Sequence, residues 1–231
     1  MKIVEAINHL ATTHLDCTND WYGWREIDET NLPSGIVLPP GNQYRKNEAL
    51  KIELSKRMTN TDCQATRSEL IRYYISTWGG ISGNLDETME GYGLASPDNL
   101  ISRGSRGIAS WSKALCIHNP NKYAIFDARV SASLNALQII YNTDNKVLFP
   151  VLASRNHVIK EGVVLIRNEA LAAGWIGAAD QDFYRDYLGY LEEVVAATDK
   201  SIPCSIYTVE MLLFSMAEAL INQAFHCKKS K

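Results

Sequence analysis

The sequence predicts a mostly helical fold. Apolar residues recur at helical spacing along most of the chain, as Ile3, Ile7 and Leu10 do near its start. Glycine and proline separate these segments, and alternating strand patterns are weak. Two short stretches, 36–38 and 146–152, are the candidate strands. We therefore expect an all-α domain with at most one minor pair of strands.

The first half of the chain contains two further predicted helices. Three prolines and two glycines make residues 31–42 a loop, and the charged stretch 43–59 that follows has a helical pattern. Asp62 is a suitable N-cap for the next helix, and Gly79 and Gly80 are expected to end that helix.

In the second half, Ser96 and Pro97 are typical of the N-cap and first position of a helix. The last predicted helix is apolar on several sides, so we expect it to be buried. The helices predicted from apolar periodicity are 107–117, 128–141, 163–173, 181–197 and 208–225.

The length of 231 residues fits a single domain, 1–231, or two small lobes that share a core. With 46% hydrophobic and 21% charged residues, such a chain can bury a core without disulfides or metal. The five cysteines are scattered and form no zinc or iron–sulfur pattern, so we expect free thiols, no metal and no cofactor. They are Cys17, Cys63, Cys116, Cys204 and Cys227.

The N-terminal stretch has an amphipathic helix pattern and lacks the continuous apolar run of a signal peptide. No segment reaches the roughly 20 apolar residues of a membrane span. We therefore expect a monomeric cytoplasmic protein without a membrane partner.

The charge is unevenly distributed. The net charge of −3 gives no sign of a nucleic-acid partner, but residues 101–130 have a local net charge of +4. A basic strip in a mildly acidic protein is typical of phosphate contact, although it is also compatible with a solvated face. The charged residues of the strip are Arg103, Arg106, Lys113, Lys122 and Arg129, against Asp127.

The same region carries an ordered motif. Residues 103–130 read RGSRGIASWSKALCIHNPNKYAIFDARV, so Ser112-Lys113 precedes Asn119-Pro120, and Ile125-Phe126 precedes Asp127-Ala128-Arg129-Val130. This order resembles the helix–hairpin–helix DNA glycosylase superfamily, most closely its 8-oxoguanine glycosylase-like branch. Weaker matches are Trp78-Gly79-Gly80-Ile81 with Asn84, and Glu210-Met211-x-Leu213-Phe214.

The resemblance implies two helical lobes with a cleft between them and a helix–hairpin–helix and catalytic segment at about 98–141. It also implies Lys113 and Asp127 as the catalytic pair and double-stranded DNA with a modified base as the partner. The hairpin usually reads Leu-Pro-Gly-x-Gly, whereas this chain has Arg103-Gly104-Ser105-Arg106-Gly107, so direct charge is expected to replace part of the backbone grip. The predicted DNA contacts are Arg103, Gly104, Arg106, Gly107, Ser112 and Arg129.

The residue types suit this chemistry. Cleavage of an N-glycosidic bond develops positive charge on the sugar, which a carboxylate such as Asp127 stabilises. A neutral lysine such as Lys113 can attack C1′ and form a Schiff base. Each residue also has a simpler interpretation, since Asp127 suits the N-cap of the helix after it and an isolated lysine is usually solvated.

Aromatic residues supply a possible base pocket, because enzymes of this type hold the extruded base between flat side chains. Core packing is the favoured alternative for most of them, and Trp111 fits core and DNA contact equally well. The candidates are Trp21, Tyr22, Trp24, Trp78 and His118.

Several functions stay open at this stage. Within the glycosylase class, the substrate is glucosylated hydroxymethylcytosine of phage DNA, in antiviral defence, or 8-oxoguanine, in repair with lyase activity. From other classes, the alternatives are a non-catalytic helix–hairpin–helix DNA-binding module and an interaction protein that uses an exposed apolar face of 208–225.

Overall fold

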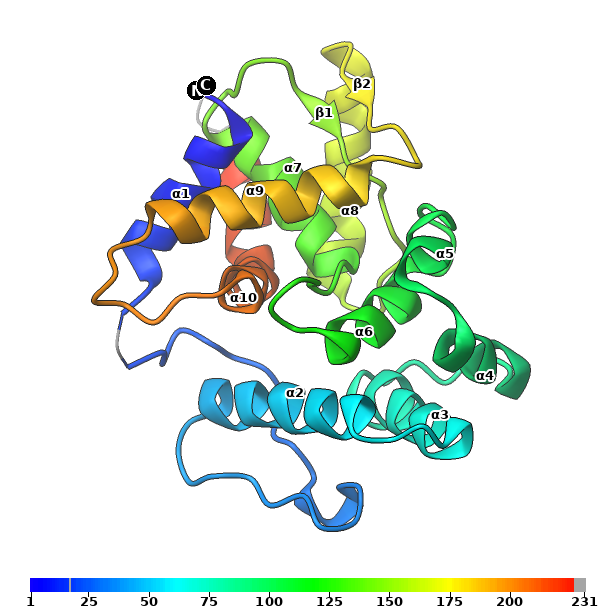
Figure 1. Ribbon diagram of the computed structural model, residues 1–231. Coiled ribbons are helices and arrows are strands. Elements are labelled where there is room, and N and C mark those ends of the chain that lie inside the picture. Colours follow the sequence, from blue (N-terminus) through cyan, green and yellow to red (C-terminus); the bar gives the residue numbers. More distant parts are fainter. Residues whose placement is uncertain (17, 227–231) are drawn as a thin grey trace. The chain divides into compact units, whose positions relative to one another are not determined.

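The computed structural model describes residues 1–16 and 18–226 and confirms the mostly helical fold. By its contacts, the chain divides into two compact units. Unit 1 consists of residues 1–17 with 126–231, and unit 2 consists of residues 18–125. Figure 1 follows the chain through both units. Because the second unit is an insertion into the first, the chain passes between units twice, after residue 17 and after Ile125.

Unit 2, residues 18–125, is built around α2 and α6. Leu50 and Leu54 of α2 and Trp111 and Leu115 of α6 are fully buried, so apolar burial stabilises this pair of helices. The core position of Trp111 favours packing over DNA contact for this residue. The elements are η1 (Glu29–Asn31), α2 (Gln43–Thr59), α3 (Gln64–Arg72), the π-helix η2 (Tyr73–Trp78), α4 (Asp86–Leu94), α5 (Pro97–Ile101) and α6 (Ile108–His118).

Unit 1 is centred on the packing of α7 against α10. The Ser133 hydroxyl on α7 donates to the carbonyl of Leu213 on α10 at 2.5 Å, which places the two backbones close together. A Cβ at Gly162 of α8 would lie 2.6 Å from Ile221 of α10, so this contact also requires a glycine. The elements are α1 (Ile3–His14), α7 (Ala128–Ile140), β1 (Val147–Leu148), α8 (His157–Ala172), β2 (Ile176–Gly177), α9 (Phe183–Ala197) and α10 (Ile206–His226).

Helix α10 is buried as predicted, with every residue from Ile206 to Phe214 buried. Its neighbours are α1, α7, α8 and α9. The exposed apolar face that the interaction-protein alternative requires is therefore not present over this stretch.

The strand predictions were partly wrong. Residues 36–38 form no strand, because Ile36 and Leu38 are buried from within a loop. The second candidate shortens to β1, which pairs in parallel with β2 through Val147 and Ile176. In place of further strand pairing, a side chain of α7 binds the backbone of β1, since Gln138 Oε1 accepts from the N–H of Val147 at 2.8 Å.

Two helix starts also differ from prediction. The N-cap of α3 is Cys63, one residue after Asp62. Helix α8 begins at His157, six residues before the predicted start, because the side chain of Asn156 caps it by accepting from the N–H of Ile159 at 3.1 Å. The predicted cap of α5 is confirmed, since the Ser96 hydroxyl accepts from the N–H of Asn99.

Candidate active site

Lys113 lies on α6 and is buried, with 4% of its surface exposed. Its Nζ donates to the carbonyl of Ala109, one turn earlier, at 2.9 Å. Its Cε packs against Gly79, where a Cβ would lie 2.9 Å away. The interpretation of Lys113 as a solvated surface lysine is therefore wrong, and its stem is confined between α6 and the end of η2.

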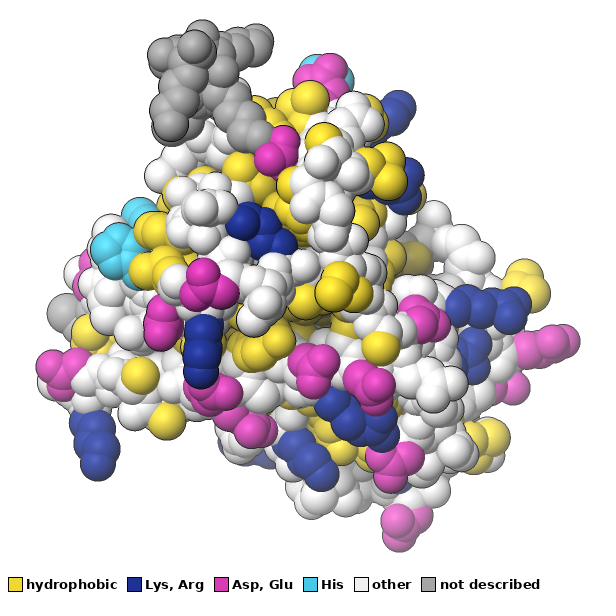
Figure 2. Space-filling view, turned by 90° about the horizontal axis from the view of Figure 1, so that it is seen from above, with side chains coloured by type: hydrophobic (Ala, Val, Ile, Leu, Met, Phe, Trp, Pro, Cys, Tyr) yellow, Lys and Arg dark blue, Asp and Glu magenta, His cyan; other side chains and the backbone are white. Residues whose placement is uncertain are grey.

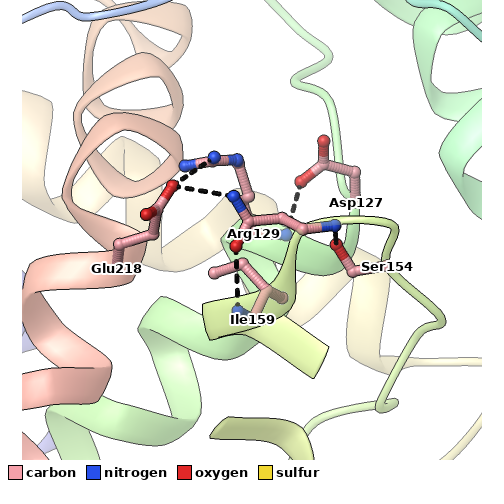
Figure 3. A network of polar contacts seen from close by, with 6 residues as sticks. Asp127, Arg129, Ser154, Ile159 and Glu218 are labelled. Carbon is pink, nitrogen blue, oxygen red and sulfur yellow. Dashed lines mark hydrogen bonds and ion pairs between the residues drawn. The ribbon is translucent and has the colours of Figure 1, made fainter. Parts of the chain in front are cut away.

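Asp127 is the N-cap of α7. Its Oδ1 accepts from the N–H of Arg129 at 2.9 Å and of Val130 at 3.1 Å, which confirms the capping interpretation. Both bonds use one oxygen, and Oδ2 points away from the helix in Figure 3. Oδ2 makes no hydrogen bond with the described residues, so half of the carboxylate remains available to a ligand.

The two catalytic candidates belong to different units. Lys113 is in unit 2 and Asp127 in unit 1, and the chain crosses from one to the other between Ile125 and Phe126. Fully buried residues flank the crossing, with Ala124 in one unit and Phe126 in the other. Phe126 packs its ring edge against Phe183 of α9 at 5.2 Å, which anchors the start of unit 1 directly before Asp127.

Arg129, a predicted DNA contact, is part of an internal network (Figure 3). Its Nη2 lies 2.5 Å from Glu218 Oε1 on α10, and its guanidinium lies 5.1 Å from the ring of Phe214. Glu218 also accepts from Asn156 Nδ2 at 3.0 Å. The charge of Arg129 is therefore compensated by Glu218 within unit 1. Arg129 thus does not add an uncompensated positive charge to the predicted basic strip.

The segment that joins α5 and α6 forms a tight turn over residues 102–107. Gly104 and Gly107 have φ angles of +59° and +71°, which favour glycine, and Gly107 is the N-cap of α6. Arg103 and Arg106 are both exposed, and Arg103 lies over the ring of Tyr92 at 5.6 Å. The turn thus combines two required glycines with two exposed cations.

Ser112 is not placed to contact DNA. Its side chain is fully buried, and its hydroxyl donates to the carbonyl of Ile108 at 2.6 Å within α6. The helical period explains this error, because the residue before Lys113 faces the core of unit 2.

The surface charge is mixed. Figure 2 shows acidic and basic side chains interspersed on the face it presents. Within residues 101–130, Arg103, Arg106 and Lys122 are exposed, and all three belong to unit 2. The available cations of the predicted strip are therefore confined to the turn before α6 and the segment after it.

The aromatic candidates separate into a packed group and a cavity. Trp21 and Tyr22 pack edge to face at 6.0 Å, and Trp21 also lies 5.4 Å from the ring of Tyr44, as core packing predicts. In contrast, Trp24 and Trp78 both line a cavity of about 260 Å³ in unit 2.

His118 ends α6 and is partly buried. Burial lowers its pKa, and the nearby charge of Arg67 lowers it further, whereas a hydrogen bond with the backbone of Tyr92 acts in the opposite direction. Its Nε2 is buried and has no hydrogen-bond partner among the described residues. Its surroundings therefore favour the neutral ring, five residues along α6 from Lys113.

Sequence reasoning missed Asp28 and Tyr73, which line the cavity with the two tryptophans, and Glu218, which holds Arg129. Asp28 lies in an irregular loop, and no periodic pattern marks it. The acidic position at 218 within an apolar helix was a usable signal, because a half-buried carboxylate requires a partner.

Residues 1–16 and 18–226 contain no group of three or more His, Cys, Asp or Glu side chains that could hold a metal ion. Cys63, Cys116 and Cys204 are free thiols, whereas Cys17 and Cys227 lie outside the described residues. None of the described helices combines the length and apolar character needed to cross a bilayer.

The chain was compared with known proteins in three ways. No protein-family model matches it, and neither the curated proteins nor the solved structures gave a significant match.

Proposed function

We propose that this protein is a DNA N-glycosylase that extrudes a modified base from double-stranded DNA and excises it, leaving an abasic site. The observation that carries the proposal is Lys113, a buried lysine whose stem packs on Gly79 and which follows a turn with two positive-φ glycines. Burying a lysine in this way is costly, and a buried ionisable group is a candidate functional residue.

In the proposed reaction, the neutral amine of Lys113 attacks C1′ of the extruded nucleotide. The N-glycosidic bond breaks, and its electron pair leaves with the base, which takes up a proton. The C1′–O4′ bond of the sugar ring then breaks, O4′ takes up the second proton of the amine, and the opened sugar remains joined to Lys113 as a Schiff base, from which water releases the abasic site. Asp127 stabilises the positive charge that develops on the sugar, through the oxygen that the helix cap leaves available.

Two substrates fit this class. One is glucosylated hydroxymethylcytosine of phage DNA, in which case the protein acts in antiviral defence. The other is 8-oxoguanine, which implies repair with lyase activity.

The experiment that tests the proposal is excision on a panel of duplexes, with and without alkaline cleavage of abasic sites. The panel contains 8-oxoguanine, uracil, alkylated adenine, hydroxymethylcytosine and glucosylated hydroxymethylcytosine. We expect cleavage of one substrate, loss of cleavage in Lys113→Gln and Asp127→Asn, and borohydride trapping that is lost in Lys113→Gln. Full trapping by Lys113→Gln would refute the assignment of Lys113 as the nucleophile.

A second candidate function, a non-catalytic DNA-binding module, is favoured by one observation. The turn over residues 102–107, with its glycines and exposed arginines, lies entirely in unit 2 and needs neither Lys113 nor Asp127 to bind phosphate. Duplex binding without excision of any panel member would favour this module.

A further inference from the structure

The cavity lined by Trp24 and Trp78 lies wholly within unit 2 and has a volume of about 260 Å³. Its walls come from the loop after Trp24 and from the π-helix η2, which contributes Tyr73 and Trp78. π-helical turns are rare and cluster at functional sites. The cavity is slightly smaller than most ligand pockets, and with three aromatic residues in its lining, Trp24, Tyr73 and Trp78, it suits a small ring-shaped ligand.

Trp78 is a fixed wall of this cavity. Its ring stacks on Tyr74 at 4.3 Å with an interplanar angle of 12°, and its Nε1 donates to Asn47 Oδ1 at 2.7 Å. A flat side chain that is already held in place loses little conformational freedom when a ring stacks on it. The cavity therefore presents a preorganised aromatic surface.

The charged side chains that line the cavity are two carboxylates, Glu26 and Asp28, and one guanidinium, Arg25. Arg25 directs its Nη2 to the backbone carbonyls of Thr77 and Trp78, which occupies that donor internally. Asp28 lines the cavity and is exposed, so it lies where the cavity opens. Hydrogen bonds from the Thr30 side chain and backbone lower the pKa of Asp28, which keeps this carboxylate charged at neutral pH.

We propose that this cavity binds an amino-bearing heterocyclic ring, which stacks beside Trp24 and Trp78 and donates its exocyclic amino group to the Asp28 carboxylate. The carboxylates of Glu26 and Asp28 outnumber the one cation of the lining, Arg25, and this net negative charge disfavours a phosphate group, so the ligand enters with its ring and not with its backbone. A carboxylate accepts from an amino group but repels a carbonyl oxygen at the same ring position. The cavity thus discriminates amino-substituted from oxo-substituted rings.

The cavity is linked to Lys113 through the chain. Gly79 directly follows Trp78, and the Lys113 stem packs on Gly79. If the protein is the glycosylase proposed above, the ring in the cavity is the extruded base, and this part of the inference rests on that function. Binding of a free heterocycle does not depend on it.

The test uses the full-length protein and two matched pairs of free nucleosides, deoxycytidine with deoxyuridine and deoxyadenosine with deoxyinosine. Each pair differs in an amino against an oxo group. Binding is followed by tryptophan fluorescence. The variants Trp24→Phe and Trp78→Phe show whether the signal comes from the cavity. Trp175→Phe, at a position in unit 1, is the control. We expect the amino member of each pair to bind about three- to tenfold more tightly, the range of one ordinary net hydrogen bond, because Asp28 is exposed to solvent.

Asp28→Asn keeps the shape of the loop, because asparagine also caps η1, and it should remove the preference within each pair. Glu90→Gln, an exposed acid of unit 2 outside the cavity, should leave the preference unchanged. Three outcomes would overturn the proposal. The first is equal affinity within both pairs, and the second is a preference that survives in Asp28→Asn. The third is a signal that survives in both Trp24→Phe and Trp78→Phe but not in Trp175→Phe.

The result for the cavity can be distinguished from the result for the proposed glycosylase activity. Excision of a panel base whose selectivity is unchanged in Asp28→Asn would leave the enzyme in place and overturn the cavity assignment. Selective nucleoside binding without excision on any duplex would support the cavity and count against the enzyme.

Discussion

Asp127 Oδ1 accepts a hydrogen bond from the backbone N–H of Arg129 at 2.9 Å, and the same oxygen accepts from Val130. Capping of α7 and catalysis are therefore assigned to different oxygens of one carboxylate. Asparagine can reproduce the cap through its amide oxygen but cannot supply the negative charge. The two roles of this residue can be measured separately.

We expect Asp127→Asn to retain the stability of the wild type to within about 0.5 kcal/mol, because asparagine is an equally good N-cap. Asp127→Ala should lose about 1 kcal/mol, the usual cost of a missing cap. Both variants should lose base excision. Urea unfolding and the excision assay check the two effects, and excision that persists in Asp127→Asn would reduce the residue to a cap.

A second prediction concerns the contact between Gly79 and Lys113. A methyl group at position 79 would lie 2.6 Å from the carbonyl of Ile75 and 2.9 Å from Lys113 Cε, so Gly79→Ala must displace the lysine stem. We expect a loss of about 1–3 kcal/mol in stability, the usual cost of overpacking. Modification of Lys113 by an amine-reactive reagent, followed by mass spectrometry, should become faster.

Gly83→Ala is the matched control, because a methyl group at Gly83 would meet no heavy atom within 4 Å. This variant should leave both stability and Lys113 labelling unchanged. If Gly79→Ala labels at the wild-type rate, the packing of Lys113 against this glycine does not control its accessibility.

We expect Arg106 to contribute to DNA binding and Arg129 to contribute to the stability of the fold. The Arg106 side chain is exposed and makes no hydrogen bond or ion pair with the described residues, whereas Arg129 is paired with Glu218. We expect Arg106→Gln to weaken duplex binding and to reduce the slope of log affinity against log salt by about 0.9, the value for one lost phosphate contact. Arg129→Gln should instead cost about 1 kcal/mol of stability, as for a partly exposed ion pair.

Fluorescence anisotropy across a salt series measures the slopes, and urea unfolding measures the stabilities. A salt slope that falls in Arg129→Gln and not in Arg106→Gln would reverse the assignment. Glu218→Gln supplies a check on the pair, because it removes the charge that Arg129 contacts and should resemble Arg129→Gln in stability.

Most of the helices were predictable because their apolar periodicity and caps are local properties of the sequence, although α4 was not predicted. Ser96 with Pro97, and Asp127 as a cap, are confirmed. The start of α8 was missed because residues 157–162 carry few apolar side chains, although Asn156 before them was a usable cap signal. The strand at 36–38 was wrong because buried apolar residues in a proline-rich loop mimic a strand pattern.

The candidate site was less predictable, since it depends on contacts between distant segments. Burial of Lys113 depends on Gly79, and compensation of Arg129 depends on Glu218, which is 89 residues away. The division of the chain between Ile125 and Phe126 has no compositional signal, because apolar residues run through it without glycine or proline. The cavity was found only in part, since Trp24 and Trp78 were candidates and Asp28 was not.

The last prediction is a pH dependence from His118. Burial lowers its pKa below the ordinary value of about 6.5, which the unfolded chain retains. As pH falls below about 6.5, the unfolded state takes up a proton that the folded state does not, so the free energy of unfolding decreases until the folded pKa is reached. Above that window the residue contributes no pH dependence.

His118→Gln should therefore remove part of the loss in stability of the wild type between pH 7 and pH 5, as measured by urea unfolding at each pH. Subtracting the two curves cancels carboxylates such as Asp28 and Asp199, whose lowered pKa values make their contributions fall at more acidic pH. Parallel curves for the wild type and His118→Gln would mean that His118 titrates with its ordinary pKa and that its surroundings do not favour the neutral ring.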